Sequence, residues 1–109
     1  ERAREILAAR DRPTAIFCVN DDAAAGVLKA AWELGIHVPH ELSVVGFDDV
    51  AMSRRLLPPL TTVGVDKERL GSKALERLLE LVAGNGGEIR QESVPVRLVV
   101  RDSTGPAPE

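Results

Sequence analysis

The sequence contains few of the residues that stabilise small secreted domains. It has one cysteine, Cys18, so an internal disulfide is excluded. Because Cys18 lies inside an apolar run, we expect a small buried side chain in a reducing compartment. Aromatic residues amount to 3% of the 109 residues, and tyrosine is absent, whereas 44% of the residues are hydrophobic. The sequence therefore predicts a single small domain, or a piece of a larger one, with an aliphatic core.

An excess of positive charge is also absent. The 14 lysines and arginines are outnumbered by 17 aspartates and glutamates, which gives a net charge of −3. Phosphate contacts need clustered cations, so this chain by itself is not expected to bind nucleic acid. No apolar run approaches the roughly 18 residues that cross a membrane, and no signal peptide is visible. The chain begins without methionine, and its first ten residues have a helical pattern, so we expect a truncated start.

The first half of the chain has the pattern of two strands joined by a helix. Residues 14–19 and 42–47 are almost continuously apolar, which is typical of strands covered on both faces in a parallel sheet. Between them, "NDDAAAGVLKAAWELG" has apolar residues at helical spacing. Asn20 or an adjacent aspartate can cap the start of this helix, and Gly35 fits just beyond its end. Strand, helix and strand at this length predict a βαβ unit with a right-handed crossover.

The second half predicts a helix, a turn and a strand. Asp66 can cap a helix that extends to Ala83. Its apolar face consists of Leu70, Ala74, Leu75, Leu78, Leu79 and Val82. "NGGE", residues 85–88, predicts a turn. "SVPVRLVVRDS" alternates between apolar residues and arginines, which predicts a strand exposed on one side, and residues 105–109 are expected to be disordered.

Polar side chains follow each of the two predicted parallel strands. Asn20 and Asp21 follow the first strand, and Asp48 and Asp49 follow the second. Ligands of open α/β sheets bind outside the carboxyl ends of the strands, so Asn20 and Asp48 would reach one small molecule if the strands are neighbours. An amide and a carboxylate suit a ligand rich in hydroxyls, such as a sugar or a nucleoside. The pattern fits equally well if Asn20 only caps the helix and Asp48 only forms a turn.

Metal binding and catalysis are less favoured by the pattern. Asp21, Asp22, Asp48 and Asp49 have the residue type that holds Mg²⁺ in phosphoryl-transfer folds, but no nucleophile or phosphate-binding lysine accompanies them. Pro39 separates His37 from His40, so these histidines are expected on a surface loop. No serine or cysteine lies in a recognisable motif with a histidine. We therefore predict no catalytic residue, no metal site and no cofactor.

An ordered set of motifs covers nearly the whole chain. It consists of "PTAIFCVNDDAAAGVLKAAWELGIHVPHELSVVGFDDV", "PPLTTV", "LGSKALERLLELVAG" and "PVRLVVRDST". This set resembles the C-terminal part of the lactose/galactose repressor family of bacterial transcription regulators. In that family a helix-turn-helix precedes a two-lobed effector domain of the periplasmic-binding-protein type. Nothing here resembles the helix-turn-helix, so the resemblance implies the last third or so of such a regulator.

The resemblance implies a fold and a division of the chain. The fold would be α/β, a parallel-sheet βαβ arrangement that forms part of a periplasmic-binding-protein-like type I fold. Residues 1–65 would belong to the C-terminal lobe of the effector domain. Residues 66–93 would be a helix and turn of the N-terminal lobe, and residues 94–109 would be the return strand and a disordered tail. The regulator would act in the cytoplasm and contact DNA only through the absent helix-turn-helix.

The resemblance also assigns roles to the polar residues at the strand ends. Asn20 and Asp48 match the residues that bind the small-molecule effector in the family. Asp49 matches a structural position, and Asp21 is expected to cap the helix. Many family members carry a glutamine after "TTV" that reaches the effector. Val65 stands there in this chain, so one polar contact is missing and the identity of the effector is open.

The resemblance also implies a homodimer or a higher homo-oligomer, because family members dimerise partly through the segments that match residues 22–34 and 51–58. The apolar candidates for such an interface are Ala25, Met52, Leu56 and Leu57. Their alternative role is ordinary core packing. A fragment of a periplasmic sugar-binding transport protein would share the fold and is the rival interpretation. The "PPLTTV" and "VVRDST" motifs favour the regulator.

Overall fold

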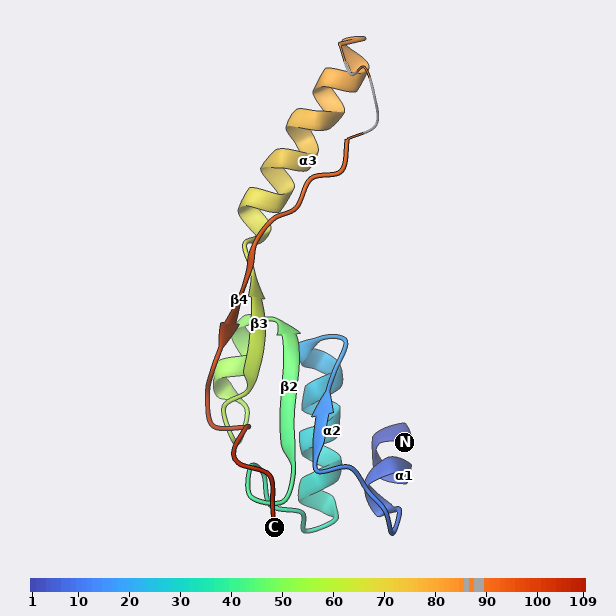
Figure 1. The fold of residues 1–109 in the computed structure, drawn as a ribbon, viewed down its shortest axis with the longest axis vertical. Helices are drawn as coiled ribbons and strands as arrows, with labels where there is room; N and C mark the ends of the chain where they lie inside the picture. The colour runs from blue at the N-terminus through green and yellow to red at the C-terminus, as the bar shows by residue number, and fades with distance from the viewer. Residues whose placement is uncertain (86, 88–89) are drawn as a thin grey trace. The chain divides into compact units, whose positions relative to one another are not determined.

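The structure is a computed structural model that describes residues 1–85, 87 and 90–109. Within these residues, four strands form one sheet in the order β1-β2-β3-β4 (Figure 1). The strands are β1 (Ala15–Phe17), β2 (Ser43–Asp48), β3 (Thr61–Val65) and β4 (Val96–Val99). The helices are α1 (Arg2–Ala8), α2 (Asp21–Glu33), the short 3-10 helix η1 (Ala51–Arg55) and α3 (Lys67–Val82). The turn predicted at 85–88 includes two residues outside the described part.

The predicted βαβ unit is confirmed. β1 pairs in parallel with β2, with Phe17 opposite Val45, and α2 connects the two strands. β2 pairs in parallel with β3, with Phe47 opposite Val63. The α/β class and the parallel sheet predicted from the sequence are therefore correct. This arrangement puts the carboxyl ends of β1, β2 and β3 at the same edge of the sheet.

The chain divides into two compact units. Residues 1–64 and 97–109 form the first unit, and residues 65–96 form the second, which contains α3. The assignment of residues 66–93 to a different lobe stays a prediction, because the rest of that lobe would lie outside this chain. Among the described residues, no helix is long and apolar enough to cross a membrane.

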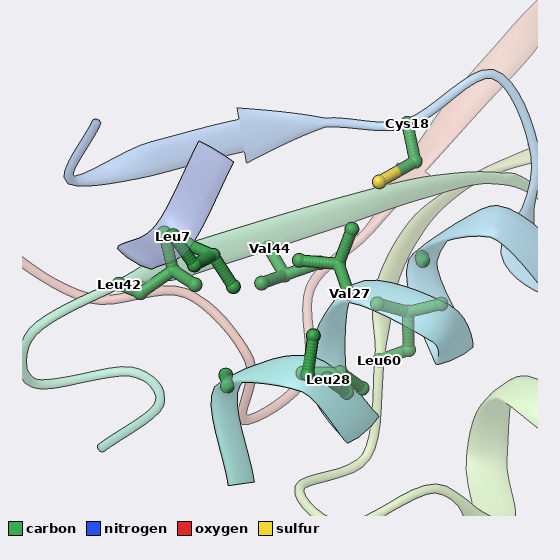
Figure 2. Packing of buried hydrophobic residues seen from close by; sticks show 10 residues of the cluster. Leu7, Cys18, Val27, Leu28, Leu42, Val44 and Leu60 are labelled. Carbon is green, nitrogen blue, oxygen red and sulfur yellow. The ribbon is translucent and has the colours of Figure 1, made fainter. Parts of the chain in front are cut away.

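The core of the first unit is aliphatic, as the composition predicts. It consists of Leu7, Cys18, Ala24, Val27, Leu28, Ala30, Ala31, Leu42, Val44 and Leu60. Figure 2 shows these side chains gathered around α2, with Val44 of β2 facing the helix. Burial of one leucine or valine side chain stabilises the fold by about 1.5–3 kcal/mol. The core therefore fixes α2 against the sheet and positions the strand ends next to the helix start.

The expectation that the first strand is covered on both faces is wrong. Successive side chains of a strand point to opposite faces. Cys18 is buried in the core, whereas Phe17 is 66% exposed and Val19 is also exposed. The apolar run at 14–19 therefore has one face in the core and one face open in this chain.

The alternating segment around β4 also differs from the prediction in which of its sides is buried. Val96, Leu98 and Val100 are exposed, although they form the apolar side of the pattern. The side chain of Arg101, from the charged side, is only 14% exposed. A buried guanidinium is stable only when it is paired and hydrogen-bonded, and Arg101 has such partners in the first unit. At Arg101, the charged side of this segment is therefore buried, whereas the apolar side is exposed.

The C-terminal segment is anchored to the sheet up to Gly105. The backbone N–H of Val44 donates to the carbonyl of Ser103 at 2.8 Å, and the Ser103 hydroxyl donates to the carbonyl of Val44 at 2.6 Å. The N–H of Gly105 donates to the hydroxyl of Ser43 at 3.1 Å. The predicted disordered tail therefore does not include Gly105, because its N–H is bound to β2.

Candidate functional site

Asn20 is the N-cap of α2 and lies at the end of β1. Its Oδ1 accepts a hydrogen bond from the N–H of Ala23 at 2.8 Å, which satisfies one of the free donors of the first helical turn. This bond uses the side-chain oxygen and not the NH₂ group, which has two donors. The prediction that Asp21 caps the helix is wrong, because Asn20 has this role.

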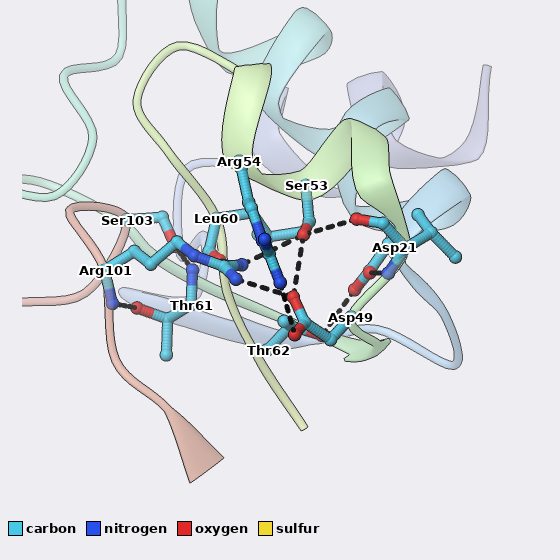
Figure 3. A network of polar contacts seen from close by, with 10 residues as sticks. Asp21, Asp49, Ser53, Arg54, Leu60, Thr61, Thr62, Arg101 and Ser103 are labelled. Atoms are coloured by element: carbon cyan, nitrogen blue, oxygen red, sulfur yellow. Dashed lines mark hydrogen bonds and ion pairs between the residues drawn. The ribbon is translucent and has the colours of Figure 1, made fainter. Parts of the chain in front are cut away.

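Asp21 is instead a buried link between three elements. Its side chain is 1% exposed. One carboxylate oxygen accepts a hydrogen bond from the backbone N–H of Val50 at 2.8 Å, and the other accepts one from the hydroxyl of Thr62. Figure 3 shows Asp21 at one end of a polar network that reaches β3. Asp21 thus holds the start of α2 against β3 and against the loop that follows β2.

Asp48 and Asp49 have an unusual backbone conformation at the end of β2. Their φ angles are 104° and 49°, in a region that few residues other than glycine adopt. Aspartate tolerates this region better than most residues, but such a conformation costs about 1–3 kcal/mol for each residue. It persists only where the surrounding contacts determine it. Strained residues of this kind are concentrated at ligand-binding and catalytic sites.

Contacts to Asp49 supply this constraint. The side chain of Asp49 is 8% exposed, and its Oδ1 lies 2.6 Å from Nη2 of Arg101 (Figure 3). The hydroxyl of Ser53 lies 3.2 Å from the same oxygen, and Arg54 Nη2 lies 3.6 Å from Oδ2. The hydrogen bond from Arg101 lowers the pKa of Asp49 below its ordinary value of 3.8, against the opposing effect of burial. These contacts fit the structural role expected for Asp49.

The ion pair between Asp49 and Arg101 should stabilise the fold in a way that depends on pH. The pKa of Asp49 is lower in the folded state than in the unfolded state. Ionised Asp49 therefore stabilises the fold above the unfolded pKa of about 4, and this stabilisation is lost as the pH falls through the lower folded pKa. We expect wild type to lose more unfolding free energy than Asp49→Asn when the pH is lowered through this range. Urea titrations of both proteins at a series of pH values measure this difference. Identical pH dependence in the two proteins would contradict it.

Asn20 and Asp48 lie at equivalent positions of neighbouring strands, although Asn20 follows β1 and Asp48 is the last residue of the longer β2. Phe17 of β1 is paired with Val45 of β2, and each of the two polar residues comes three positions after a member of this pair. The carboxyl ends of the two strands therefore deliver an amide and a carboxylate to the same edge of the sheet. This geometry is the one in which open α/β sheets bind ligands. The pairing of Asn20 and Asp48 on one ligand stays a prediction.

The predicted interface residues differ in their exposure. Leu57 is 90% exposed and Met52 is also exposed, so neither belongs to the core. Leu56 is partly buried against the core, and Ala25 is partly buried on α2. A shallow cavity of about 190 Å³ adjoins Leu57. Its lining consists of Leu28, Trp32, Ile36, His37, Val38, Leu57 and Pro58.

The histidines and aspartates do not form a metal site in the described part of the chain, where no three His, Cys, Asp or Glu side chains are grouped around a possible ion. His37 is an exposed loop residue whose backbone N–H and Nδ1 both lie within hydrogen-bond distance of Glu41. These bonds, together with one from Arg12, lower the pKa of Glu41 to about 2. His37 therefore closes a turn, as a surface-loop residue would.

Two parts of the site were not predicted from the sequence. The buried role of Asp21 was missed because helix caps and buried carboxylates have the same local pattern. The inward position of Arg101 was missed because its partner is 52 residues away. An arginine flanked by valine and aspartate at the end of an apolar strand was the available signal for Arg101.

The geometry above agrees with comparisons to known proteins. Residues 1–104 match the model of a periplasmic binding protein-like domain. The chain therefore belongs to the periplasmic binding protein-like domain family. Within that family its similarity is to repressors, which confirms the resemblance to the lactose/galactose repressor family.

Two curated relatives carry this similarity. The HTH-type transcriptional repressor PurR of Mannheimia succiniciproducens is 43% identical over 103 residues, which cover 94% of this chain and 31% of the repressor. PurR of Vibrio vulnificus is 39% identical over 101 residues, which cover 93% of this chain and 30% of the repressor. The chain thus spans about a third of the length of the curated relatives it matches.

Solved structures give the same result. The lac repressor dimer bound to operator and the anti-inducer ONPF is similar with a TM-score of 0.85 and 38% identity, over 94% of this chain and 36% of the repressor chain. A LacI family transcriptional regulator from Enterococcus faecium with bound ribose has a TM-score of 0.80 and 30% identity, over 98% of this chain and 38% of that chain.

Proposed function

We propose that this chain is the C-terminal part of the effector-binding domain of a transcriptional repressor. The similarity of nearly all of the chain to PurR and to the lac repressor carries this proposal. The complete protein would act in the bacterial cytoplasm and bind DNA through a helix-turn-helix outside this chain. An effector bound between the two lobes would stabilise one arrangement of the lobes more than the other. Because the two arrangements would differ in their affinity for the operator, effector binding would change DNA binding. The similarity to repressors favours this function over sugar transport.

The effector would be a small polar molecule such as a sugar or a nucleoside. Asn20 would donate from its NH₂ group, and the Asp48 carboxylate would accept hydrogen bonds from hydroxyls. Two arginines near this edge, Arg54 and Arg101, already contact Asp49 and so are not expected to bind an anionic ligand. The bound ribose in the Enterococcus faecium regulator is consistent with this class of ligand.

The same proposal includes a homodimer and excludes catalysis. The exposed side chains of Leu57 and Met52 would be covered by a second copy, together with Ala25 and Leu56. The lac repressor structure that resembles this chain is itself a dimer.

Catalysis would need a nucleophile with a positioned base, and Asp21 and Asp49 are instead occupied by structural hydrogen bonds. The site would bind its effector without changing it.

Substitution of Asp48 tests the proposed site. Asp48→Ala in the complete gene product is expected to weaken effector binding about tenfold to a hundredfold, because a charge-assisted hydrogen bond is worth about 1.5–3 kcal/mol. Asn20→Ser retains an oxygen that can cap α2 but removes the NH₂ donors, so a loss of similar size is expected. Thermal-shift screening of pentoses, hexoses and nucleosides identifies a binding compound, and calorimetry then measures its affinity.

Asp22→Ala is the matched control for this experiment. Asp22 is an exposed carboxylate in the first turn of α2, and we expect its substitution to change affinity by less than about threefold. Unchanged affinity in both Asp48→Ala and Asn20→Ser would refute the assignment of the site. A loss of binding in Asp22→Ala as large as in Asp48→Ala would show that general charge, and not the Asp48 contact, determines affinity.

A further inference from the structure

The loop that follows Asp48 is held from two sides by buried polar side chains. On one side, Asp21 accepts the backbone N–H of Val50 at 2.8 Å. On the other side, the carboxylate of Asp49 contacts Arg101 at 2.6 Å, and both of these side chains are largely buried. Asp48 directly precedes both attachment points in the chain and has a φ of 104°. Its unusual backbone conformation is therefore set by its neighbours along the chain.

Arg101 is itself fixed in place by further hydrogen bonds. Its Nη1 donates to the hydroxyl of Ser53 at 2.9 Å and to the carbonyl of Leu60 at 2.8 Å, while Nη2 reaches Asp49 (Figure 3). Its backbone N–H donates to the hydroxyl of Thr61 at 2.9 Å. The planar guanidinium thus joins η1, the residue before β3 and the loop after β2 with one rigid group. A lysine offers a single ammonium and cannot reproduce this fork of donors.

We propose that Arg101 and Asp49 form a positioning pair that holds the Asp48 carboxylate in the orientation that binds the effector. The inference rests on the proposed role of Asp48 and adds residues that do not themselves touch the ligand.

The pair also links the loop after β2 to the end of β4, because Arg101 follows β4 by two residues. The chain passes from the second unit to the first between residues 96 and 97, at the start of β4. The pair therefore connects the loop at the ligand to one of the two chain crossings between the units.

Arg54 provides a matched control for Arg101. Both arginines contact the carboxylate of Asp49, but the side chain of Arg54 is 66% exposed and its nearest nitrogen is 3.6 Å away. Exposed ion pairs of this kind contribute little to stability because water and salt screen them. If the total charge near Asp49 were important, the two arginines would be equivalent. If positioning by a buried fork is important, only Arg101 should affect the loop.

The experiment compares Arg101→Lys, Asp49→Asn and Arg54→Lys with wild type in the complete gene product. The first measurement is hydrogen exchange of the segment 47–53, with the segment 24–31 of α2 as an internal reference for the fold. We expect faster exchange in 47–53 for Arg101→Lys and Asp49→Asn, and unchanged exchange in 24–31. The second is calorimetry with the sugar or nucleoside that gives the largest thermal shift with wild type. We expect about tenfold weaker binding for these two variants and less than about twofold for Arg54→Lys.

The two measurements separate this inference from the proposed function. Unchanged exchange of 47–53 in Arg101→Lys and Asp49→Asn overturns the positioning pair. Unchanged affinity for a compound that wild type binds overturns it as well, as does an equal effect of Arg54→Lys. If wild type binds no compound of the panel, the proposed effector class fails, and hydrogen exchange alone then decides whether the pair holds the loop. If Arg101→Lys also speeds hydrogen exchange in 24–31, this variant destabilises the whole fold. Asp49→Asn, which keeps the size of the side chain, then decides: faster exchange in 47–53 alone supports positioning, and faster exchange in both segments overturns it.

Discussion

The isolated 109-residue chain is expected to associate with itself through the apolar face of α3. No residue of α3, which the structure describes in full, is buried. Its large apolar residues are about half exposed or more, and they are Leu70, Leu75, Leu78, Leu79, Leu81 and Val82. A full leucine burial is worth roughly 1.5–3 kcal/mol, so covering the four half-exposed leucines of the predicted apolar face, which are all of these leucines except Leu81, contributes about 3–6 kcal/mol. Contiguous apolar surface of this kind normally marks an interface or causes aggregation.

Sedimentation velocity and light scattering over a range of concentrations measure this association. Replacement of Leu75, Leu78 and Leu79 by glutamine should shift the chain toward smaller species. Glutamine at Glu68, Ser72 and Glu76, which are also exposed on α3, is the matched control and should leave the association unchanged. A stable monomer whose residues 70–82 are helical but exchange their amide hydrogens freely would contradict this prediction. It would also weaken the assignment of α3 to a lobe that lies mostly outside this chain.

The second large effect is expected from Gly46→Ala in the middle of β2. A Cβ at this position would lie 2.3 Å from Oδ1 of Asp21 and 2.9 Å from Cδ2 of Leu60. Both neighbours are buried, and Asp21 is held by Thr62 and Val50, so it cannot move without loss of these bonds. Overpacking together with the disruption of this network should destabilise the fold by about 2–5 kcal/mol.

Thermal melts of the complete gene product followed by circular dichroism test this effect. Gly26→Ala is the control, because Gly26 lies within α2 and an added Cβ would meet nothing within 4 Å. Alanine is the better helix former, so Gly26→Ala should stabilise the fold by about 0.5–1 kcal/mol. A Tm for Gly46→Ala equal to that of wild type would contradict this prediction.

Local patterns in the sequence were sufficient for the type and order of the elements in the first half of the chain. The apolar runs, the helical spacing between them and Gly35 at the helix end predicted β1, α2 and β2, and the structure confirms all three. The scarcity of aromatic residues predicted the aliphatic core. The carboxyl-end rule for open sheets predicts Asn20 and Asp48 as ligand contacts from the sequence alone, because it needs only the strand order and the polar residues at the strand ends.

The roles of the remaining charged residues were decided by tertiary structure. Asp21, Asp48 and Asp49 are all aspartates next to strand ends, and no local pattern separates them. Asp21 became a buried link because Thr62 and Val50 offer it donors, and Asp49 became a structural residue because Arg101 reaches it. A charge is stable in the interior only where partners from distant segments meet it. The sequence by itself determined which polar residues lie near the strand ends. The tertiary structure decided that Asp21 and Asp49 are held there by buried hydrogen bonds and an ion pair, because their partners come from distant segments.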